Sequence, residues 1–278
     1  MKNYAVIGDP IQHSMSPVMH NDLFHFYGFD AEMKKMHIKT EMLEMGLKSL
    51  RDSNIDGFNV TVPHKQAIIS FLDELDPLSE AIGAVNTVVC KNGKWVGYNT
   101  DGDGYLRSLL DQLTDLKQKK TLIIGSGGAA RAIYFSLANY GVHQIDICNR
   151  TLSNAERLKE ACPFPVVTNI LEVASVEKNL EEYELIIQTT SIGMSPKIDA
   201  SPIQVSNLKK GTFVSDIIYN PLETKILKDA KAKGAITQNG IDMFVYQGAL
   251  AFEKWQGIFP DTARMRQNVL TQLGGSSC

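Results

Sequence analysis

Two residues in the first half of the chain, Lys65 and Asp101, carry ionisable side chains that can donate or accept a proton. Lys65 follows a predicted strand, and Pro63 predicts that a helix begins there with Lys65 in its first turn. A cation at that position opposes the helix dipole at a cost of ~0.3–1 kcal/mol, so stability alone does not favour it. Asp101 starts the helix after a second junction, Asn99–Gly102. If both helix starts face one cleft, the two side chains form a proton-transfer pair. Taken singly, Lys65 is also explained as a surface lysine and Asp101 as a helix N-cap.

A glycine-rich turn follows an apolar strand in the middle of the chain, over residues 121–131. The bare N–H groups of such a turn, together with a helix N-terminus, suit a pyrophosphate and therefore a dinucleotide. Glycine-rich turns also arise for packing alone. The residues predicted to hold the cofactor here are Gly125, Ser126, Gly127, Gly128 and Ala129.

The end of the next predicted strand, Asn149-Arg150-Thr151, bears on which dinucleotide binds. An NAD site usually carries an acidic residue about 20 positions beyond the glycines, which accepts hydrogen bonds from the ribose 2′-hydroxyl. A guanidinium cannot accept such a bond, but it pairs well with a 2′-phosphate. The sequence therefore favours NADP over NAD, although a solvated arginine at a strand end would also explain Arg150.

Small polar residues follow or begin several predicted strands: Ser14 and Ser16 come after the first, Thr61 after another, and Asn86 begins a hairpin. Such side chains can reach the space above strand ends and recognise a polyhydroxylated substrate. Each is also explained as a turn or cap residue, and Ser16 is the plainest candidate for a helix N-cap.

Strand and helix signals alternate in both halves, which predicts an α/β architecture with parallel sheets covered by helices. The first half predicts strands at 4–8, 31–38 and 57–61, a helix opening at Ser16-Pro17, and another capped by Thr40. It also predicts a hairpin of 86–90 and 94–98 across Asn92-Gly93. The second half has the spacing of a doubly wound nucleotide fold, with strands at 121–125, 145–149, 185–190, 212–217 and 235–238.

The segment from Gly240 to the end is helical in pattern and carries an aromatic stripe of Phe244, Phe252 and Trp255. Such stripes usually belong to a core. Because the segment follows the last nucleotide-domain strand, we expect it to return and pack on the first domain.

Composition limits the classes of function. The chain has 278 residues, of which 44% are hydrophobic and 21% charged, and a net charge of -3, so it suits two domains and offers no broad basic surface for nucleic acid. No apolar run reaches the ~18 residues of a membrane span, and we expect a cytoplasmic protein with no membrane partner. The six histidines show no ligand spacing, so no metal is expected. The cysteines lie far apart and are predicted to be reduced thiols: Cys90, Cys148, Cys162 and Cys278.

Eight motifs in this order resemble the shikimate dehydrogenase family, and the resemblance covers nearly the whole chain. It is carried by Gly8–Pro17, Asn59–Lys65, Gly83–Thr87, Asn99–Gly102, Gly125–Ala130, Asn149–Thr151, Asp216–Pro221 and Asn239–Gln247. The resemblance implies an oxidoreductase of the shikimate pathway, which leads to chorismate and the aromatic amino acids. Its reaction would be the reversible reduction of 3-dehydroshikimate to shikimate by NADPH.

The resemblance also implies domains and residue roles. An α/β substrate domain, residues 1–101 completed by helices at 241–278, would face a Rossmann-like NADP-binding domain, residues 102–240, across a cleft. Lys65 and Asp101 would be catalytic, with the remaining roles divided as follows. The substrate would contact Ser14, Ser16, Thr61, Asn86, Tyr219 and Gln247, and the cofactor would contact the glycine loop, Asn149, Arg150, Thr151, Ile217, Gly240 and Met243.

One departure from the family pattern is Asn154, where many NADP-using relatives have a second basic residue. A quinate or shikimate dehydrogenase that uses NAD therefore stays open as an alternative. A catalytically silent regulatory paralogue would be expected to lose Lys65 or Asp101, and this chain keeps both. A lyase that uses Lys65 as a Schiff-base nucleophile would leave the nucleotide domain without a task. We expect a monomer or homodimer.

Overall fold

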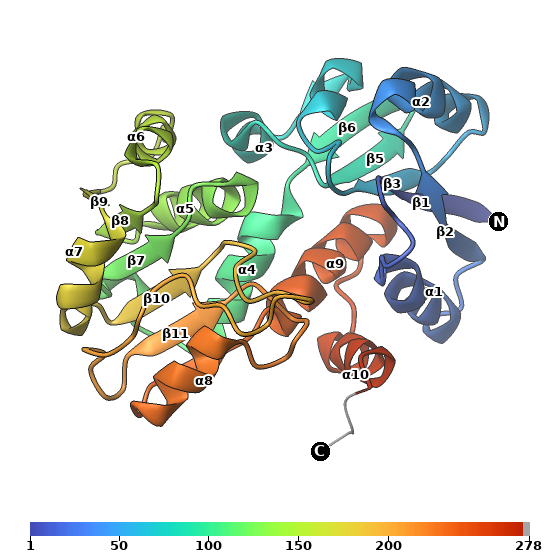
Figure 1. Ribbon diagram of the computed structural model, residues 1–278. Coiled ribbons are helices and arrows are strands. Elements are labelled where there is room, and N and C mark those ends of the chain that lie inside the picture. Colours follow the sequence, from blue (N-terminus) through green and yellow to red (C-terminus); the bar gives the residue numbers. More distant parts are fainter. Residues whose placement is uncertain (275–278) are drawn as a thin grey trace. The chain divides into compact units, whose positions relative to one another are not determined.

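The computed structural model describes residues 1–274, and its chain divides into two compact units (Figure 1). The first unit is Met1–Gly104 together with the segment from Val245 onward, and the second is Tyr105–Phe244. The boundaries fall within two helices, α4 (Thr100–Leu110) and α9 (Ile241–Gln256). Cys278, predicted to be a reduced thiol, lies outside the described residues.

A six-stranded sheet forms the centre of the first unit. Its strands are β1 (Lys2–Gly8), β2 (Ala31–His37), β3 (Gly57–Val60), β4 (Glu74–Leu75), β5 (Thr87–Lys91) and β6 (Lys94–Tyr98), in the order β2-β1-β3-β5-β6-β4. β1 pairs in parallel with β2 and β3, whereas β5 runs antiparallel to both of its neighbours. The sheet is therefore mixed. The antiparallel pair of β5 and β6 is the hairpin that the sequence predicts, whereas the antiparallel pair of β3 and β5 departs from the prediction of parallel sheets. As a result, the carboxyl ends of β1, β3 and β6 lie at the same edge as the start of β5.

The predicted hairpin is confirmed. β5 and β6 pair with Lys91 opposite Lys94, which leaves a two-residue turn. Asn92 and Gly93 in that turn have φ angles of 51° and 77°, the left-handed conformation that the tightest hairpin turns require. The hairpin returns the chain to the sheet edge at Asn99, where α4 begins.

Helices cover the sheet of the first unit. They are α1 (Ser16–Phe26), α2 (Leu43–Asp52), α3 (Pro77–Ile82), most of α9 and α10 (Thr262–Gln272), with short 3-10 turns at Thr40–Met42 and Ala67–Phe71. α2 shows why an amphipathic sequence becomes a helix here: Leu43, Leu47 and Leu50 recur on one face and are all buried in the core. Burying one such side chain contributes about 1.5–3 kcal/mol.

Two predicted helix caps are wrong. Ser16 is the first residue of α1 rather than its cap, because Met15 occupies the cap position. The Ser14 hydroxyl instead accepts a hydrogen bond from the Ser16 amide, at 3.4 Å. Thr40 opens the 3-10 turn before α2 and makes no capping bond with its side chain.

The second unit has a six-stranded sheet in which every strand pair is parallel. Its strands are β7 (Thr121–Ile124), β8 (Ile145–Cys148), β9 (Ile170–Leu171), β10 (Leu185–Gln188), β11 (Phe213–Asp216) and β12 (Ile236–Gln238), in the order β12-β11-β10-β7-β8-β9. The helices are α5 (Gly128–Tyr140), α6 (Leu152–Glu160), α7 (Val173–Lys178) and α8 (Lys225–Ala232), with 3-10 turns at Leu116–Gln118 and Leu180–Glu182. All residues of β7, β8, β10 and β11 are buried, as expected for a parallel sheet covered on both faces. The doubly wound prediction is confirmed, and only β9, two residues long, was missed.

The C-terminal helices complete the first unit, as the sequence predicted. Phe252 and Trp255 are buried there, and the Trp255 indole donates to the Val88 carbonyl of β5 at 3.0 Å. Phe244 differs from the prediction of a buried stripe, since it is partly exposed and belongs to the second unit. Over the described part of the chain, no helix is both long and apolar enough to cross a membrane.

Candidate functional site

Lys65 and Asp101 meet in the first unit. The Lys65 Nζ atom donates to Asp101 Oδ2 at 2.6 Å, although the two residues lie 36 positions apart in the sequence. Their side chains are 29% and 16% exposed, so both are accessible to a small ligand and partly shielded from water. An ammonium and a carboxylate in such a setting can hold and exchange one proton with a bound hydroxyl or ketone.

The backbone around Lys65 differs from the sequence prediction. Lys65 lies in a turn between β3 and the 3-10 turn Ala67–Phe71, and no α-helix begins at Pro63. The Lys65 carbonyl accepts a hydrogen bond from the Val85 amide at 2.8 Å, so it is engaged outside any helix. The helix-dipole argument for Lys65 is therefore wrong. Its position is set instead by the chain segment that leads into β5.

Asp101 lies in the first turn of α4 but does not cap it. The Asn99 side-chain oxygen takes that role, accepting from the amides of Asp101 at 3.1 Å and Gly102 at 3.4 Å. The interpretation of Asp101 as an N-cap is therefore wrong. Because Asn99 satisfies the helix start, the Asp101 carboxylate is left to pair with Lys65.

Asn86 contacts the other oxygen of the same carboxylate. Its Nδ2 atom donates to Asp101 Oδ1 and to Thr100 Oγ1, both at 2.9 Å. Its Oδ1 atom accepts from the Thr100 amide at 2.7 Å, and the residue is only 3% exposed. The amide of Asn86 is thus occupied within the protein, where it holds Asp101. Direct contact between Asn86 and a substrate hydroxyl stays a prediction.

The segments after β1 and β3 place the other small polar groups at the same sheet edge. The Thr61 amide donates to the Ile7 carbonyl at 2.9 Å, and the Asp9 amide donates to the Val62 carbonyl at 3.0 Å. These bonds join the segment after β1, which leads to Ser14, to the segment after β3, which contains Thr61. Ser14 and Thr61 are partly exposed, while Ser16 is buried.

Gln247 lies beside the helix that carries Asp101. A Cβ atom added at Gly104, one turn after Asp101, would lie 2.6 Å from the Gln247 backbone nitrogen. Only a glycine allows this close approach of α4 and α9, and it brings partly exposed Gln247 next to α4.

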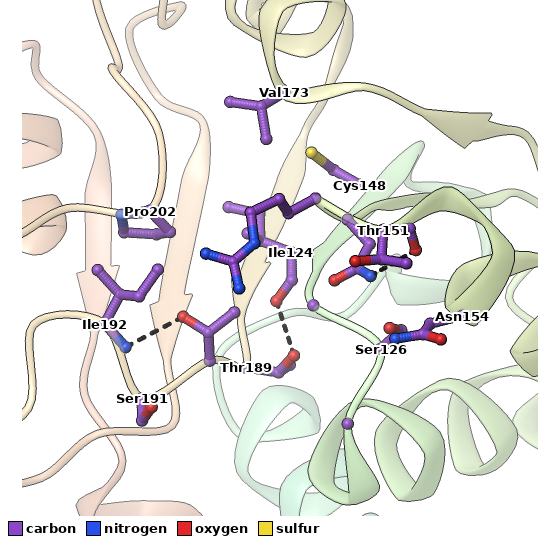
Figure 2. Close-up of a pocket in the computed structure, with 15 residues that line it drawn as sticks. Ile124, Ser126, Cys148, Thr151, Asn154, Val173, Thr189, Ser191, Ile192 and Pro202 are labelled. Carbon is purple, nitrogen blue, oxygen red and sulfur yellow. Dashed lines mark hydrogen bonds between the residues drawn. The ribbon is translucent and has the colours of Figure 1, made fainter.

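A second candidate site is a cavity of about 600 Å³ in the second unit, at the carboxyl ends of its parallel strands. Figure 2 shows Thr151 and Asn154 on one side of it and Ile192 and Pro202 on the other. The position is that of ligand sites in doubly wound folds. The lining residues are Ile124, Gly125, Ser126, Gly127, Cys148, Asn149, Arg150, Thr151, Asn154, Val173, Thr189, Thr190, Ser191, Ile192 and Pro202.

The glycines of this cavity leave room for a phosphate group. Gly125 has a φ angle of 112°, and a Cβ there would lie 2.6 Å from the Thr189 hydroxyl, so the fold itself requires glycine. A Cβ at Gly127 would meet nothing within 4 Å, so protein packing does not require glycine at that position. Open space beside bare backbone N–H groups at the start of α5 fits a pyrophosphate.

The charge of the cavity fits NADP. None of its lining residues is acidic, and the exposed Arg150 guanidinium has no hydrogen-bond or ion-pair partner within residues 1–274. A ribose 2′-hydroxyl would find no carboxylate here, whereas a 2′-phosphate would find an unpaired cation.

Asn154 stands where many NADP-using relatives have a second basic residue. Its side chain is bound by a residue one turn further along α6. The Arg157 guanidinium donates to Asn154 Oδ1. Because a guanidinium only donates, the side of the Asn154 amide turned away from Arg157 is its Nδ2 donor. Asn154 lines the cavity, and its Nδ2 donor is not engaged by Arg157.

A buried carboxylate organises the loop after β11, which carries Ile217 and Tyr219. Asp216 accepts from the Ile218 amide at 2.9 Å and from the Thr224 hydroxyl at 2.6 Å. Its burial raises the pKa of the Asp216 carboxyl to about 6. Ile217 and Tyr219 are partly exposed, and the Tyr219 ring packs on Phe244 with centroids 5.2 Å apart.

Two predicted cofactor residues lie near this loop. A Cβ at Gly240 would come within 2.0 Å of the Ile217 carbonyl oxygen, so packing alone explains the glycine. Met243 is partly exposed on the first turn of α9. The contacts of both residues with a cofactor stay predictions.

Sequence reasoning missed several polar residues at these sites: Thr87, Thr100, Thr189, Thr190 and Ser191. The last three directly follow β10, so the rule that functional groups gather at strand ends would have found them. Thr87 begins β5 and Thr100 closely follows β6, so the same rule applies to them, although both are buried. Within the described residues, no group of three or more His, Cys, Asp or Glu could hold a metal ion.

Three family models match the chain. They describe a shikimate dehydrogenase substrate binding domain (residues 6–88), a shikimate / quinate 5-dehydrogenase (108–221) and a shikimate 5′-dehydrogenase C-terminal domain (240–270). A curated relative from Bacillus cereus (strain 03BB102), named shikimate dehydrogenase (NADP(+)), is 55% identical over 98% of this chain and 99% of its own.

Solved structures are similar over nearly the full length. Shikimate 5-dehydrogenase from Listeria monocytogenes, in complex with shikimate and NAD, has a TM-score of 0.92 at 33% identity, covering 97% of this chain and 96% of that one. The shikimate 5-dehydrogenase from Thermus thermophilus, in complex with NADP(H) and shikimate, has a TM-score of 0.87 at 34% identity, covering 98% and 99%. The two complexes differ in the cofactor that they contain.

Proposed function

Because the chain belongs to the shikimate dehydrogenase family, we propose that it catalyses the reversible, NADPH-dependent reduction of 3-dehydroshikimate to shikimate. The observation that carries this proposal is the contact between Lys65 Nζ and Asp101 Oδ2, at a partly exposed position beside small polar groups. A silent paralogue on the same scaffold would have no need to maintain this pair.

We propose that Lys65 is the proton donor to the ketone oxygen of the substrate. When bound, the dihydronicotinamide supplies a hydride to the ketone carbon, which leaves negative charge on the oxygen. The Lys65 ammonium stabilises that charge by hydrogen bonding and transfers the proton that completes the hydroxyl. In the reverse direction, the Lys65 amine accepts the hydroxyl proton of shikimate.

Asp101 orients both the ammonium and the substrate in this proposal. One carboxylate oxygen receives Lys65 and the other receives Asn86, and each oxygen has a second lone pair for a substrate hydroxyl. Ser14 and Ser16 would bind the substrate carboxylate, and Thr61 and Gln247 ring hydroxyls. The shared sheet edge of Ser14, Ser16 and Thr61 and the position of Gln247 on α9 beside α4 support this assignment. The contact of Tyr219 with the substrate rests on the family resemblance alone.

The second unit would hold the cofactor. The glycine turn Gly125–Ala129 would receive the pyrophosphate, and Arg150 with Asn149 and Thr151 would receive the adenosine 2′-phosphate. The open space at Gly127 and the absence of acidic residues from the cavity lining support NADP. Asn154 is not basic, so the degree of preference for NADP over NAD has to be measured.

The proposal is tested by mixing the purified protein with shikimate and either NADP⁺ or NAD⁺, and following the absorbance of the reduced nicotinamide. We expect rapid reduction of NADP⁺ and slower reduction of NAD⁺. The same assay with quinate tests the alternative substrate. Faster turnover of quinate with NAD⁺ would replace the proposed function with that of a quinate dehydrogenase, and no turnover with any pair would reject both.

A further inference from the structure

We propose that the buried hydroxyls of Thr87 and Thr100 are positioning groups for Asp101 and act on it through the Asn86 side chain. This inference rests on the proposed catalytic role of Asp101. Neither threonine is accessible to a substrate, since their exposed fractions are 0% and 1%. Their effect on the reaction must therefore pass through another residue.

The two hydroxyls surround the Asn86 amide. Thr87 Oγ1 lies 3.1 Å from Asn86 Oδ1, and Thr100 Oγ1 lies 2.9 Å from Asn86 Nδ2. The hydroxyls also contact each other, at 3.3 Å. On the far side, Asn59 Nδ2 of β3 donates to Thr87 Oγ1 at 3.1 Å. Asn86 is thus held from both ends, by groups on β3, β5 and α4.

The direction of each bond follows from the donors present. The Thr100 amide can only donate, so the Asn86 atom it meets at 2.7 Å is the carbonyl oxygen. The atom of Asn86 that faces Asp101 is therefore its Nδ2 donor. Because Thr87 accepts from Asn59, its single proton is available for Asn86 Oδ1. Donors thus point along the chain from Asn59 to Thr87 to Asn86 and end on the Asp101 carboxylate.

This arrangement has a consequence for catalysis. Asp101 sits on the first turn of α4, and its side chain can rotate unless both oxygens are held. Lys65 holds Oδ2, but Lys65 itself must shift towards the substrate oxygen during proton transfer. Asn86 is then the remaining contact that keeps Asp101 in place, and the threonines keep Asn86 in place. A displacement of a catalytic group by about 1 Å can lower a rate by about 100-fold.

The test compares Thr87→Val and Thr100→Val with Thr87→Ser and Thr100→Ser in the full chain. Valine keeps the shape and removes the hydroxyl, while serine keeps the hydroxyl and removes a methyl group. We expect each valine variant to lower kcat for shikimate oxidation about tenfold. NADP⁺ binding, followed by fluorescence titration, should stay unchanged. Each serine variant should keep a near-normal kcat even where its unfolding temperature falls.

Two further variants separate positioning from a general structural effect. Thr212→Val removes a buried hydroxyl that donates to the Tyr183 carbonyl in the second unit, and it should leave kcat unchanged. Combining Thr87→Val with Asp101→Asn should lower kcat no further than Asp101→Asn alone, because the threonine then has no carboxylate to position.

The outcomes are distinct. Normal kcat in both valine variants would overturn the inference. If Asp101→Asn is inactive at the same time, the proposed function stays intact. Equal losses in the serine and valine variants, or losses that multiply with Asp101→Asn, would also overturn it, since they indicate a structural effect. Normal turnover of Asp101→Asn would instead reject the catalytic pair on which the proposed function depends.

Discussion

At the level of single residues, each oxygen of the Asp101 carboxylate accepts a hydrogen bond. Lys65 donates to Oδ2 and Asn86 donates to Oδ1. Two charge-assisted hydrogen bonds fix the orientation of the carboxylate plane more closely than one. In the proposed mechanism, this geometry lets a partly exposed side chain in the first turn of α4 serve as a fixed reference for a substrate hydroxyl.

We predict that Lys65→Ala and Asp101→Asn each lower kcat by about 100-fold or more with the fold intact. Proton transfer by Lys65 contributes about that much, and loss of the carboxylate that orients Lys65 misplaces the proton donor. Steady-state kinetics and circular dichroism give the two measurements. Lys94→Ala is a matched control, since it removes a lysine from an exposed 2.6 Å pair with Glu74. Activity of either site variant at the level of the control would contradict its role.

A second prediction concerns Arg150 in the proposed cofactor cavity. Arg150→Ala should weaken NADP⁺ binding by about 10- to 100-fold, since a hydrogen-bonded charge contributes about 1.5–3 kcal/mol, and should leave NAD⁺ binding nearly unchanged. Isothermal titration calorimetry with both nucleotides measures the difference. Lys159→Ala removes a cation from the neighbouring helix α6 outside the cavity lining and should bind NADP⁺ normally. An equal loss for NADP⁺ and NAD⁺ in Arg150→Ala would argue against a 2′-phosphate contact.

At the scale of elements, two glycines illustrate different demands on the backbone. Gly104 lets α4 approach the α9 backbone, whereas the space beside Gly127 is open within the described protein. The first glycine serves packing between helices. The second leaves the start of α5 accessible to a ligand.

We therefore expect opposite results from two glycine substitutions. Gly104→Ala places a Cβ 2.6 Å from the Gln247 backbone nitrogen, which cannot yield as a side chain would, and should lower stability by about 1–3 kcal/mol. Gly127→Ala should leave stability within about 0.5 kcal/mol of the original but weaken NADP⁺ binding. Urea unfolding and nucleotide titration, applied to both variants, check the two expectations. A stability loss in Gly127→Ala equal to that of Gly104→Ala would show that Gly127 also serves packing.

At the scale of the whole molecule, each unit has its own sheet and its own hydrophobic core, and the first unit is assembled from both ends of the chain. His20 is part of the interior that α1 shares with α9. Its ring lies 5.1 Å from Trp255 and 6.2 Å from Phe252 between centroids, and neither ring nitrogen has a hydrogen-bond partner in the described structure. Burial lowers the pKa of His20 from 6.5 to about 3.

This histidine makes stability depend on pH. Between pH 6.5 and 3 the unfolded chain binds the His20 proton and the folded chain does not, so stability falls as the pH falls. At pH 5 the loss is about 2 kcal/mol relative to pH 7. We expect His20→Phe to remove this component of the pH dependence, and urea unfolding at pH 7 and pH 5 measures it. The exposed His143, replaced by phenylalanine, provides the control. An unchanged difference between the two pH values in His20→Phe would show that His20 is already protonated or hydrated in the fold.

The amino-acid sequence was enough to predict the alternation of strands and helices, the Asn92-Gly93 hairpin, the glycine turn before α5 and the return of the C-terminal helices. These features depend on local patterns: apolar periodicity, turn residues and the types of residue at strand ends. The expectation that functional groups gather at strand ends also predicted that Ser14, Thr61 and Asn86 lie at the sheet edge where Lys65 and Asp101 meet.

The hydrogen-bond partner of each polar side chain could be identified only from the folded structure. Lys65 lies in a turn because its carbonyl pairs with Val85, and Asp101 is free for Lys65 because Asn99 caps α4. The Asn86 side-chain amide accepts from the Thr100 amide and donates to Asp101. The Asn154 side-chain oxygen accepts from Arg157, so its Nδ2 atom faces away from Arg157. Each of these outcomes is a competition among donors and acceptors, most of them distant in sequence, and only the folded chain brings the competitors within hydrogen-bond distance.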